Sequence, residues 1–271
     1  MDRCVLDAFS KFRCHNIEPI LIKGWAIARY YPKVTFRPSS DVDLAFSRAD
    51  IEAAYRIHEN IGSRGLALDL HNELKHLDTL SWSELYGKSQ LVDLDGTPIR
   101  VLCPEDHLRV LCVHWLIDGG GFRDRLWDIY YAVENRPSDF DWVRCLSLVS
   151  KQRRRWIVCV IGLTNKYLGL NIEDLPFAEE AKQLPKWLVK AVEREWASNV
   201  RLLPLHDFSR PPRELFQQIF KRIPPNPIHA TVDMEGSFDS RTRLHYQIGT
   251  ILKRSVPTIK RTLQILGFKF K

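Results

Sequence analysis

The stretch PILIKGWAIARYYPKVTFRPSSDVDLAF, residues 19–46, decides the fold. Residues 19–22 are a short apolar run between a proline and Lys23-Gly24, which is typical of a buried strand. Residues 24–31 predict a short helix that Pro32 stops, and residues 37–40 have the composition of a turn. Residues 41–46 alternate polar and apolar side chains, which predicts a second strand.

Two carboxylates, Asp41 and Asp43, stand one residue apart on this second strand. Successive side chains of a strand point to opposite faces, so these two share a face and repel each other unless a cation lies between them. Mg²⁺ prefers oxygen ligands and keeps sites open for phosphate, so the pair predicts a magnesium site. Asp69, on a strand predicted at residues 66–72, adds a third carboxylate, and three carboxylates can hold two metal ions. A turn or a solvated strand end is the alternative for an Asp-x-Asp taken alone.

A phosphate site is predicted beside this pair. Gly24 lets the backbone approach a phosphate closely, and the start of a helix offers unpaired N–H groups to it. Lys23 adds a positive charge. Residues 19–46 therefore combine a phosphate cradle with a metal-binding pair.

Several stretches match one family in the same order along the chain. They are residues 22–28, 31–32, 37–44, 68–71, 102–108 with His114, and 125–129. On these stretches the sequence resembles the uncharacterised branch of the polymerase-beta-type nucleotidyltransferase superfamily. In that branch Lys-Gly replaces the usual Gly-Ser, and the resemblance spans roughly residues 3–170.

The resemblance implies an α+β fold, with a minimal nucleotidyltransferase mixed β-sheet and flanking helices followed by a helical domain. It implies Mg²⁺, as two ions that Mn²⁺ can replace, and an NTP substrate with ATP first among the nucleotides. The implied metal ligands, which are also the catalytic residues, are Asp41, Asp43 and Asp69. The implied contacts to the nucleotide are Lys23, Gly24, Arg37 and Ser40.

The sequence also departs from the family pattern. Trp25 stands where a small residue is commoner, so it can reshape the phosphate cradle or contact substrate. The Ser of the wider superfamily is missing, and the compact connection between Asp43 and Asp69 predicts that one of the usual strands is absent. His71 shares a face with Asp69 and can orient the acceptor or the third carboxylate, or it is a structural histidine. Glu73 is the rival for the third carboxylate.

Two further polar residues are assigned structural positions. His114 lies among Leu111, Val113 and Trp115, which predicts a core histidine rather than a ligand. Asp128 lies in an arginine-rich helix and predicts an internal ion pair.

The rest of the chain divides by composition. Asp95-Gly96 between residues 90–94 and 97–102 predicts a hairpin, and Pro104 opens a long helix. We expect a catalytic domain at residues 1–102, a helical domain that closes the nucleotide cleft at residues 103–200, and a proline-rich arm with a basic amphipathic tail at residues 201–271. The segment 201–239 is expected to be a linker or wrapping arm with one helix at residues 213–221, and a further helix is expected to start at Ser255.

The net charge of +7 is concentrated in the tail. Residues 240–271 hold eight Lys or Arg and no acid, which leaves 32 basic and 33 acidic residues in the first 239. The tail is expected to dock on the slightly acidic body, and the alternatives are binding to a membrane surface, an acidic peptide or nucleic acid. No apolar run reaches the length of about 18 residues that a membrane span needs, and no signal-peptide core is present, so the expected location is the cytoplasm.

The expected activity is transfer of NMP from an NTP to a hydroxyl or phosphate of a small-molecule, peptide or protein acceptor, with release of pyrophosphate. Two alternatives remain open. One is a nucleotide-binding or antitoxin-like regulatory protein that performs no chemistry on the same fold. The other is addition of nucleotides to RNA ends, which the near-neutral body disfavours because polymer substrates need an extended basic surface. The sequence does not determine the acceptor or the oligomeric state.

Overall fold

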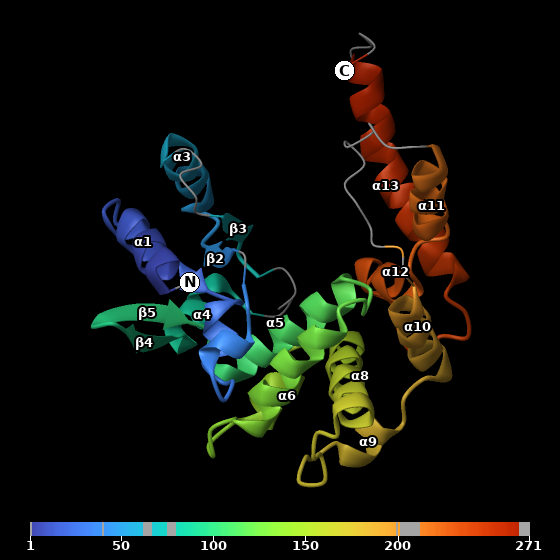
Figure 1. Ribbon diagram of the computed structural model, residues 1–271, viewed down its shortest axis with the longest axis horizontal. Coiled ribbons are helices and arrows are strands. Elements are labelled where there is room, and N and C mark those ends of the chain that lie inside the picture. Colours follow the sequence, from blue (N-terminus) through green and yellow to red (C-terminus); the bar gives the residue numbers. More distant parts are fainter. Residues whose placement is uncertain are drawn as a thin grey trace.

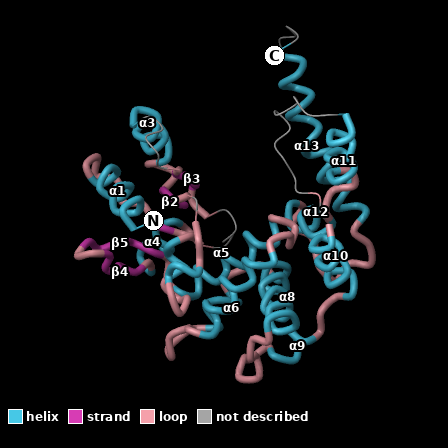
Figure 2. The backbone as a smooth tube through the Cα atoms, viewed as in Figure 1, coloured by secondary structure: helices cyan, strands magenta, loops and turns pink. Residues whose placement is uncertain are grey.

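The computed structural model describes residues 2–39, 41–61, 67–74, 80–198, 200 and 212–265. A sheet with its own helices forms the first part of the chain, and helices alone form the rest (Figures 1 and 2). The fold is therefore α+β, as the sequence predicts. Among the described residues, no helix combines the length and the apolar composition needed to cross a bilayer.

The sheet has five strands in the order β3-β2-β1-β5-β4. The strands are β1 (Ile20–Leu21), β2 (Val42–Phe46), β3 (Leu68–Asn72), β4 (Gln90–Leu94) and β5 (Thr97–Val101). β1 pairs antiparallel with β2 and parallel with β5, while β4 and β5 form the predicted hairpin. β2 and β3 are parallel because helix α3 (Ile51–Ile61) connects them, and parallel neighbours need such a crossover.

Each face of the sheet is covered by a different pair of helices. On one face, Val42, Leu44 and Phe46 of β2 pack with α1 (Asp2–Arg13) and α3 in one buried cluster. On the other face, Ala45 packs in a second cluster with α4 (Trp82–Lys88) and α5 (Pro104–Ile117). Asp43 alternates with Leu44 along the strand and so lies on the α5 side.

The helical half is built around α5, whose side chains are buried over most of its length. The helices after α5 are η2 (Arg123–Arg125), α6 (Leu126–Glu134), α7 (Trp142–Ser147), α8 (Lys151–Leu168), α9 (Ala178–Lys182) and α10 (Lys186–Ala197). Their apolar side chains form the largest core of the molecule, into which Ile27 of α2 (Trp25–Ala28) also packs. This shared core fixes the sheet against the helical half.

The C-terminal segments differ in part from the sequence-based expectation. α11 (Pro212–Arg222) agrees with the helix predicted at residues 213–221. The prediction omitted α12 (Pro227–Asp233), whose Ile228 and Ala230 are fully buried. Its proline at the first turn suits a helix start, and Asn226 caps it through the backbone N–H groups of Ile228 and His229. The arm that was expected to resist a compact core therefore contributes to one.

The final helix, α13 (Leu244–Ile265), begins earlier than expected. A proline in a helix interior is unfavourable, so Pro257 predicted a helix start at Ser255, and this prediction is wrong. Thr250 of α13 is fully buried, and Gly249 lies so close to Met234 that an added Cβ would stand 2.8 Å from its Cε. This packing against the turn after α12 orders the helix before the proline. Residues 266–271 lie outside the described part of the chain.

Candidate active site

The register of β2 and β3 places two of the three predicted carboxylates opposite each other, since Asp43 pairs with Asp69. Their side chains share a face because both strands follow the same alternation. His71 lies two residues along β3, and its Nε2 is 3.3 Å from Asp43 Oδ1 and 3.1 Å from Asp69 Oδ2. One ligand atom from each of these three residues lies within 4.8 Å of the others. The strands thus bring together a group that can hold a cation.

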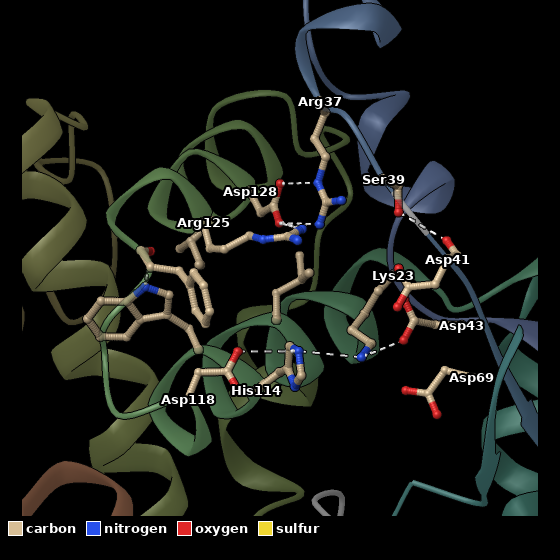
Figure 3. A pocket seen from close by; sticks show the side chains of 14 residues that line it. Lys23, Arg37, Ser39, Asp41, Asp43, Asp69, His114, Asp118, Arg125 and Asp128 are labelled. Atoms are coloured by element: carbon tan, nitrogen blue, oxygen red, sulfur yellow. Dashed lines mark hydrogen bonds and ion pairs between the residues drawn. The ribbon is translucent and has the colours of Figure 1, made fainter. Parts of the chain in front are cut away.

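Asp41 belongs to the same site although it precedes β2. It lines one cavity with Asp43 and Asp69, and its side chain lies beside that of Asp43 (Figure 3). Its backbone carbonyl accepts a hydrogen bond from the Ser39 hydroxyl at 3.0 Å, which fixes the turn before the strand. Ser40 lies outside the described residues, so its predicted phosphate contact stays a prediction.

Lys23 supplies the positive charge of this site. Its Nζ is 2.7 Å from Asp43 Oδ1, and both side chains are almost completely buried. Burial raises the pKa of Asp43, but the hydrogen bond with His71 and the charge of Lys23 outweigh it, so the pKa falls below its usual value of 3.8. Asp43 is therefore an anion at neutral pH, as a metal ligand must be.

Gly24 has a conformation that fits a glycine and few other residues. Its φ is +56°, and a Cβ added there would stand 3.0 Å from the Ser39 hydroxyl oxygen. This conformation turns the chain sharply from β1 and Lys23 into α2. Trp25, the first residue of α2, is buried in the core with Val5, Leu44 and their neighbours. It does not line the cavity that Asp41, Asp43 and Asp69 share.

Arg37 does not reach into the cavity as a lone cation. Its Nε and Nη2 donate to the two carboxylate oxygens of Asp128 at 3.0 and 2.9 Å (Figure 3). Tyr31 donates its hydroxyl to the same carboxylate at 2.7 Å. Arg37 and Asp128 are both buried. Asp128 is therefore an internal ion-pair partner, as predicted, but its main partner is 91 residues away rather than on its own helix. Arg125, half exposed, lies 3.8 Å from the same carboxylate.

The helical half adds groups that the sequence analysis did not assign to the site. The cavity, of about 310 Å³, is lined from the helical side by His114, Asp118 and Phe122 among others. His114 Nε2 lies 3.4 Å from Lys23 Nζ and 3.6 Å from Asp118 Oδ2, and its side chain is 43% exposed. The prediction of a core position for His114 is therefore wrong. Burial raises the pKa of Asp118 to about 6, against the opposing charge of Lys23.

The site is thus a polar cleft between a mixed sheet and a helical half. Three carboxylates, a lysine and an arginine lie on the sheet side, and the helical side contributes a histidine, two aspartates and an arginine. Facing carboxylates at the edge of such a cleft suit a protein that handles phosphate groups through bound cations.

Comparison with known proteins identifies the family of this chain. The chain belongs to a family described as uncharacterised nucleotidyltransferases, which matches residues 4–169. The family supports a transferase that acts on a nucleotide. A crystal structure of an antigenic nucleotidyltransferase-like protein from Paracoccidioides brasiliensis is similar, with 13% identity, a TM-score of 0.44, and coverage of 66% of this chain and 90% of that chain. A search of curated proteins gave no match.

Proposed function

We propose that the protein is a Mg²⁺-dependent nucleotidyltransferase that transfers NMP from an NTP to a hydroxyl or phosphate of an acceptor and releases pyrophosphate. The observation that carries the proposal is the pairing of Asp43 with Asp69 across β2 and β3, beside Asp41 and facing a cleft. Neighbouring carboxylates of this kind repel each other, and a divalent cation relieves that repulsion.

The donor set fits Mg²⁺. Asp41, Asp43 and Asp69 would hold it, because carboxylate oxygens are the ligands that this cation prefers. Imidazole is a ligand for softer metals, so His71, within 3.3 Å of Asp43 and Asp69, acts by positioning them rather than by binding the ion. When bound, divalent cations neutralise the phosphates and stabilise the attacking and leaving oxygens.

Lys23 binds the phosphates of the NTP in this proposal. In the structure its ammonium group balances Asp43 at 2.7 Å and also lies beside His114. A lysine ammonium is a compact charge on a flexible stem, so it can turn from the carboxylate to a phosphate oxygen once a cation balances Asp43. Arg125 faces the same cleft from the helical side and offers a second cation to the phosphates.

In this proposal Arg37 positions the chain before β2 and does not bind the phosphates. Its bidentate pair with Asp128 holds the chain at Arg37 against α6, shortly before Asp41 enters the cleft. Arg37 is a positioning residue in this account, because Asp128 occupies its Nε and Nη2.

In the reaction the acceptor oxygen forms a bond to the α-phosphorus, and the bond from that phosphorus to the β-phosphate bridging oxygen breaks. The electron pair leaves with pyrophosphate, and the proton of an acceptor hydroxyl goes to a base. Asp69, whose side chain is 53% exposed at the cleft, is placed to take that proton. The cleft also accelerates the reaction by holding the two reactants in the orientation needed for attack.

Calorimetry with Mg²⁺ and each NTP, followed by a pyrophosphate-release assay that adds heat-treated cell extract as the source of acceptor, tests the proposal. We expect binding and release with the wild type, and at least about 100-fold slower release for Asp41→Ala and Asp43→Ala, since metal ions contribute several kcal/mol to transition-state stabilisation. Asp7→Ala, on the exposed face of α1, is the matched control and keeps the wild-type rate. Binding without release would favour the regulatory alternative, and unchanged release in either cleft variant would disprove the proposal.

A further inference from the structure

A second cavity reaches the reaction centre from the other side. Its volume is about 810 Å³, and it shares Lys23 and His114 with the first cavity. His71, which contacts both Asp43 and Asp69, also lines it. Asp41, Asp43 and Asp69 line only the first cavity. The two cavities therefore meet at Lys23 and His114, and His71 of the second cavity contacts two carboxylates of the first.

The floor of the second cavity is apolar. Ile22 after β1, Leu85 of α4 and Val110 of α5 line it, and all three belong to the buried cluster on this face of the sheet. Trp82, the first residue of α4, adds an aromatic wall and lies near the ring of Tyr86. Such a floor suits the apolar or aromatic body of a ligand, and not a chain of phosphates.

The rim of the second cavity carries balanced charges. Arg153 of α8 donates to Glu235, after α12, at 3.0 Å, and the backbone N–H of Arg48 donates to Glu73 at 3.3 Å. All four residues line the cavity. A polynucleotide requires an extended basic surface, which the described residues of this rim do not offer. The rim also shows that α8 and the turn after α12 close the cavity from the helical half.

We propose that this second cavity is the acceptor site, and that it takes a small molecule whose hydroxyl is carried on an apolar or aromatic body. The inference rests on the proposed function, because it assumes that the nucleotide occupies the first cavity beside the carboxylates. A volume of about 810 Å³ falls within the range of small-molecule sites. The acceptor hydroxyl lies at the junction near His71, where its oxygen bonds to the α-phosphorus as pyrophosphate leaves. The apolar body rests on Trp82, Leu85 and Val110.

Label transfer tests the acceptor site. The full-length protein, Mg²⁺ and an NTP labelled at the α-phosphate are incubated with the fraction of a cell extract that passes an ultrafilter too fine for protein and RNA, and in parallel with the retained fraction. We expect label in a product of the small-molecule fraction that reversed-phase chromatography retains more strongly than the NMP itself. Label confined to protein or RNA, or NMP as the only product, overturns the proposal.

Variants of the aromatic wall locate the acceptor. Trp82→Ala is expected to lower transfer to the small molecule by about tenfold at limiting extract, since it removes one large apolar contact, while Trp82→Phe keeps most of it. Binding of the NTP stays unchanged in both variants. Trp127→Ala is the control, because this ring stacks on Tyr131 outside both cavities. Equal rates for Trp82→Ala and Trp127→Ala overturn the acceptor site alone.

Failure of the proposed function has a different signature. If wild type and Asp43→Ala consume the NTP equally, or if neither consumes it, the nucleotidyltransferase proposal fails and the acceptor site fails with it. Circular dichroism melts of each variant show that a lost rate comes from the cavity and not from unfolding.

Discussion

Removal of the Asp128 carboxylate is expected to destabilise the protein strongly. Asp128 accepts three hydrogen bonds, two from Arg37 and one from Tyr31, and its side chain is only 5% exposed. Asp128→Ala leaves the Arg37 guanidinium, 6% exposed, without its anion. Breaking a buried pair from one side costs about 3–5 kcal/mol, which is a large part of a typical unfolding free energy of about 5–15 kcal/mol.

The pair itself is expected to contribute little net stability. Burial raises the pKa of Asp128 more than Arg37 and Tyr31 lower it, so desolvation outweighs the attraction. Replacement of both partners, in Arg37→Leu with Asp128→Leu, should therefore recover most of the loss, since buried pairs often exchange for apolar residues at little cost. A double-mutant cycle should show a coupling energy of about 2 kcal/mol or more.

Urea denaturation followed by circular dichroism measures these free energies. Asp174→Ala is the matched control, because Asp174 also pairs with an arginine, Arg136, but its side chain is 58% exposed. An exposed pair of this kind is worth about 0–1 kcal/mol. If Asp128→Ala costs no more than Asp174→Ala, the buried ion pair between Arg37 and α6 is refuted.

Three further predictions concern the sheet side of the cleft. Gly24→Ala should cost about 1–3 kcal/mol, because φ is +56° and the new Cβ would meet Ser39, whereas Gly87→Ala in α4, where nothing lies within 4 Å, should be neutral or stabilising in the same thermal melts. Because the pKa of Asp43 is lowered in the folded protein, its charge stabilises the fold above the usual value of 3.8 and this contribution is lost as the pH falls below it. The difference in melting temperature between wild type and Asp43→Asn should therefore shrink as the pH falls from about 5 to about 3. A difference that stays constant over this range would contradict the lowered pKa of Asp43. Lys23→Met should raise the KM for the NTP in pyrophosphate-release assays, and an unchanged KM would exclude Lys23 as a phosphate contact.

The sheet side of the site could be predicted because its determinants are local. Alternation along β2 places Asp43 on the face that meets the cleft, with Asp41 just before the strand, and a strand–helix–strand order makes β3 parallel to β2. Those two facts bring Asp69 to Asp43 without any knowledge of the remaining fold. The hairpin at Asp95-Gly96 follows from its turn residues in the same way.

The helical side could not be predicted, because its determinants are distant in the sequence. α5 is apolar around most of its circumference, so periodicity does not tell which face meets the sheet, and His114 was assigned to the core. Arg37 and Asp128 lie 91 residues apart, and no local pattern joins them. One local signal for the helical side was available. Asp118 lies at the end of α5, directly before three glycines, and an acid at a helix end next to a glycine run is a candidate site residue.

The C-terminal arm shows the limit of composition as a guide. Prolines in residues 204–227 favoured a linker, yet Pro227 occupies a first helical turn, where proline is well tolerated. The apolar residues that follow it, Ile228 and Ala230, are fully buried. Their burial depends on a surface of the helical half that the local sequence does not reveal.

The central claim is that Asp69, opposite Asp43, completes the metal site. The most direct test is the rate of pyrophosphate release from Mg²⁺ and NTP by Asp69→Asn and by Asp7→Asn, with heat-treated cell extract as the source of acceptor. Asp7 is the control acid, because it lies on the exposed face of α1 and lines neither cavity. We expect the release rate of Asp69→Asn to fall about 100-fold or more, and that of Asp7→Asn to stay within about threefold of wild type. A wild-type rate in Asp69→Asn would contradict the account.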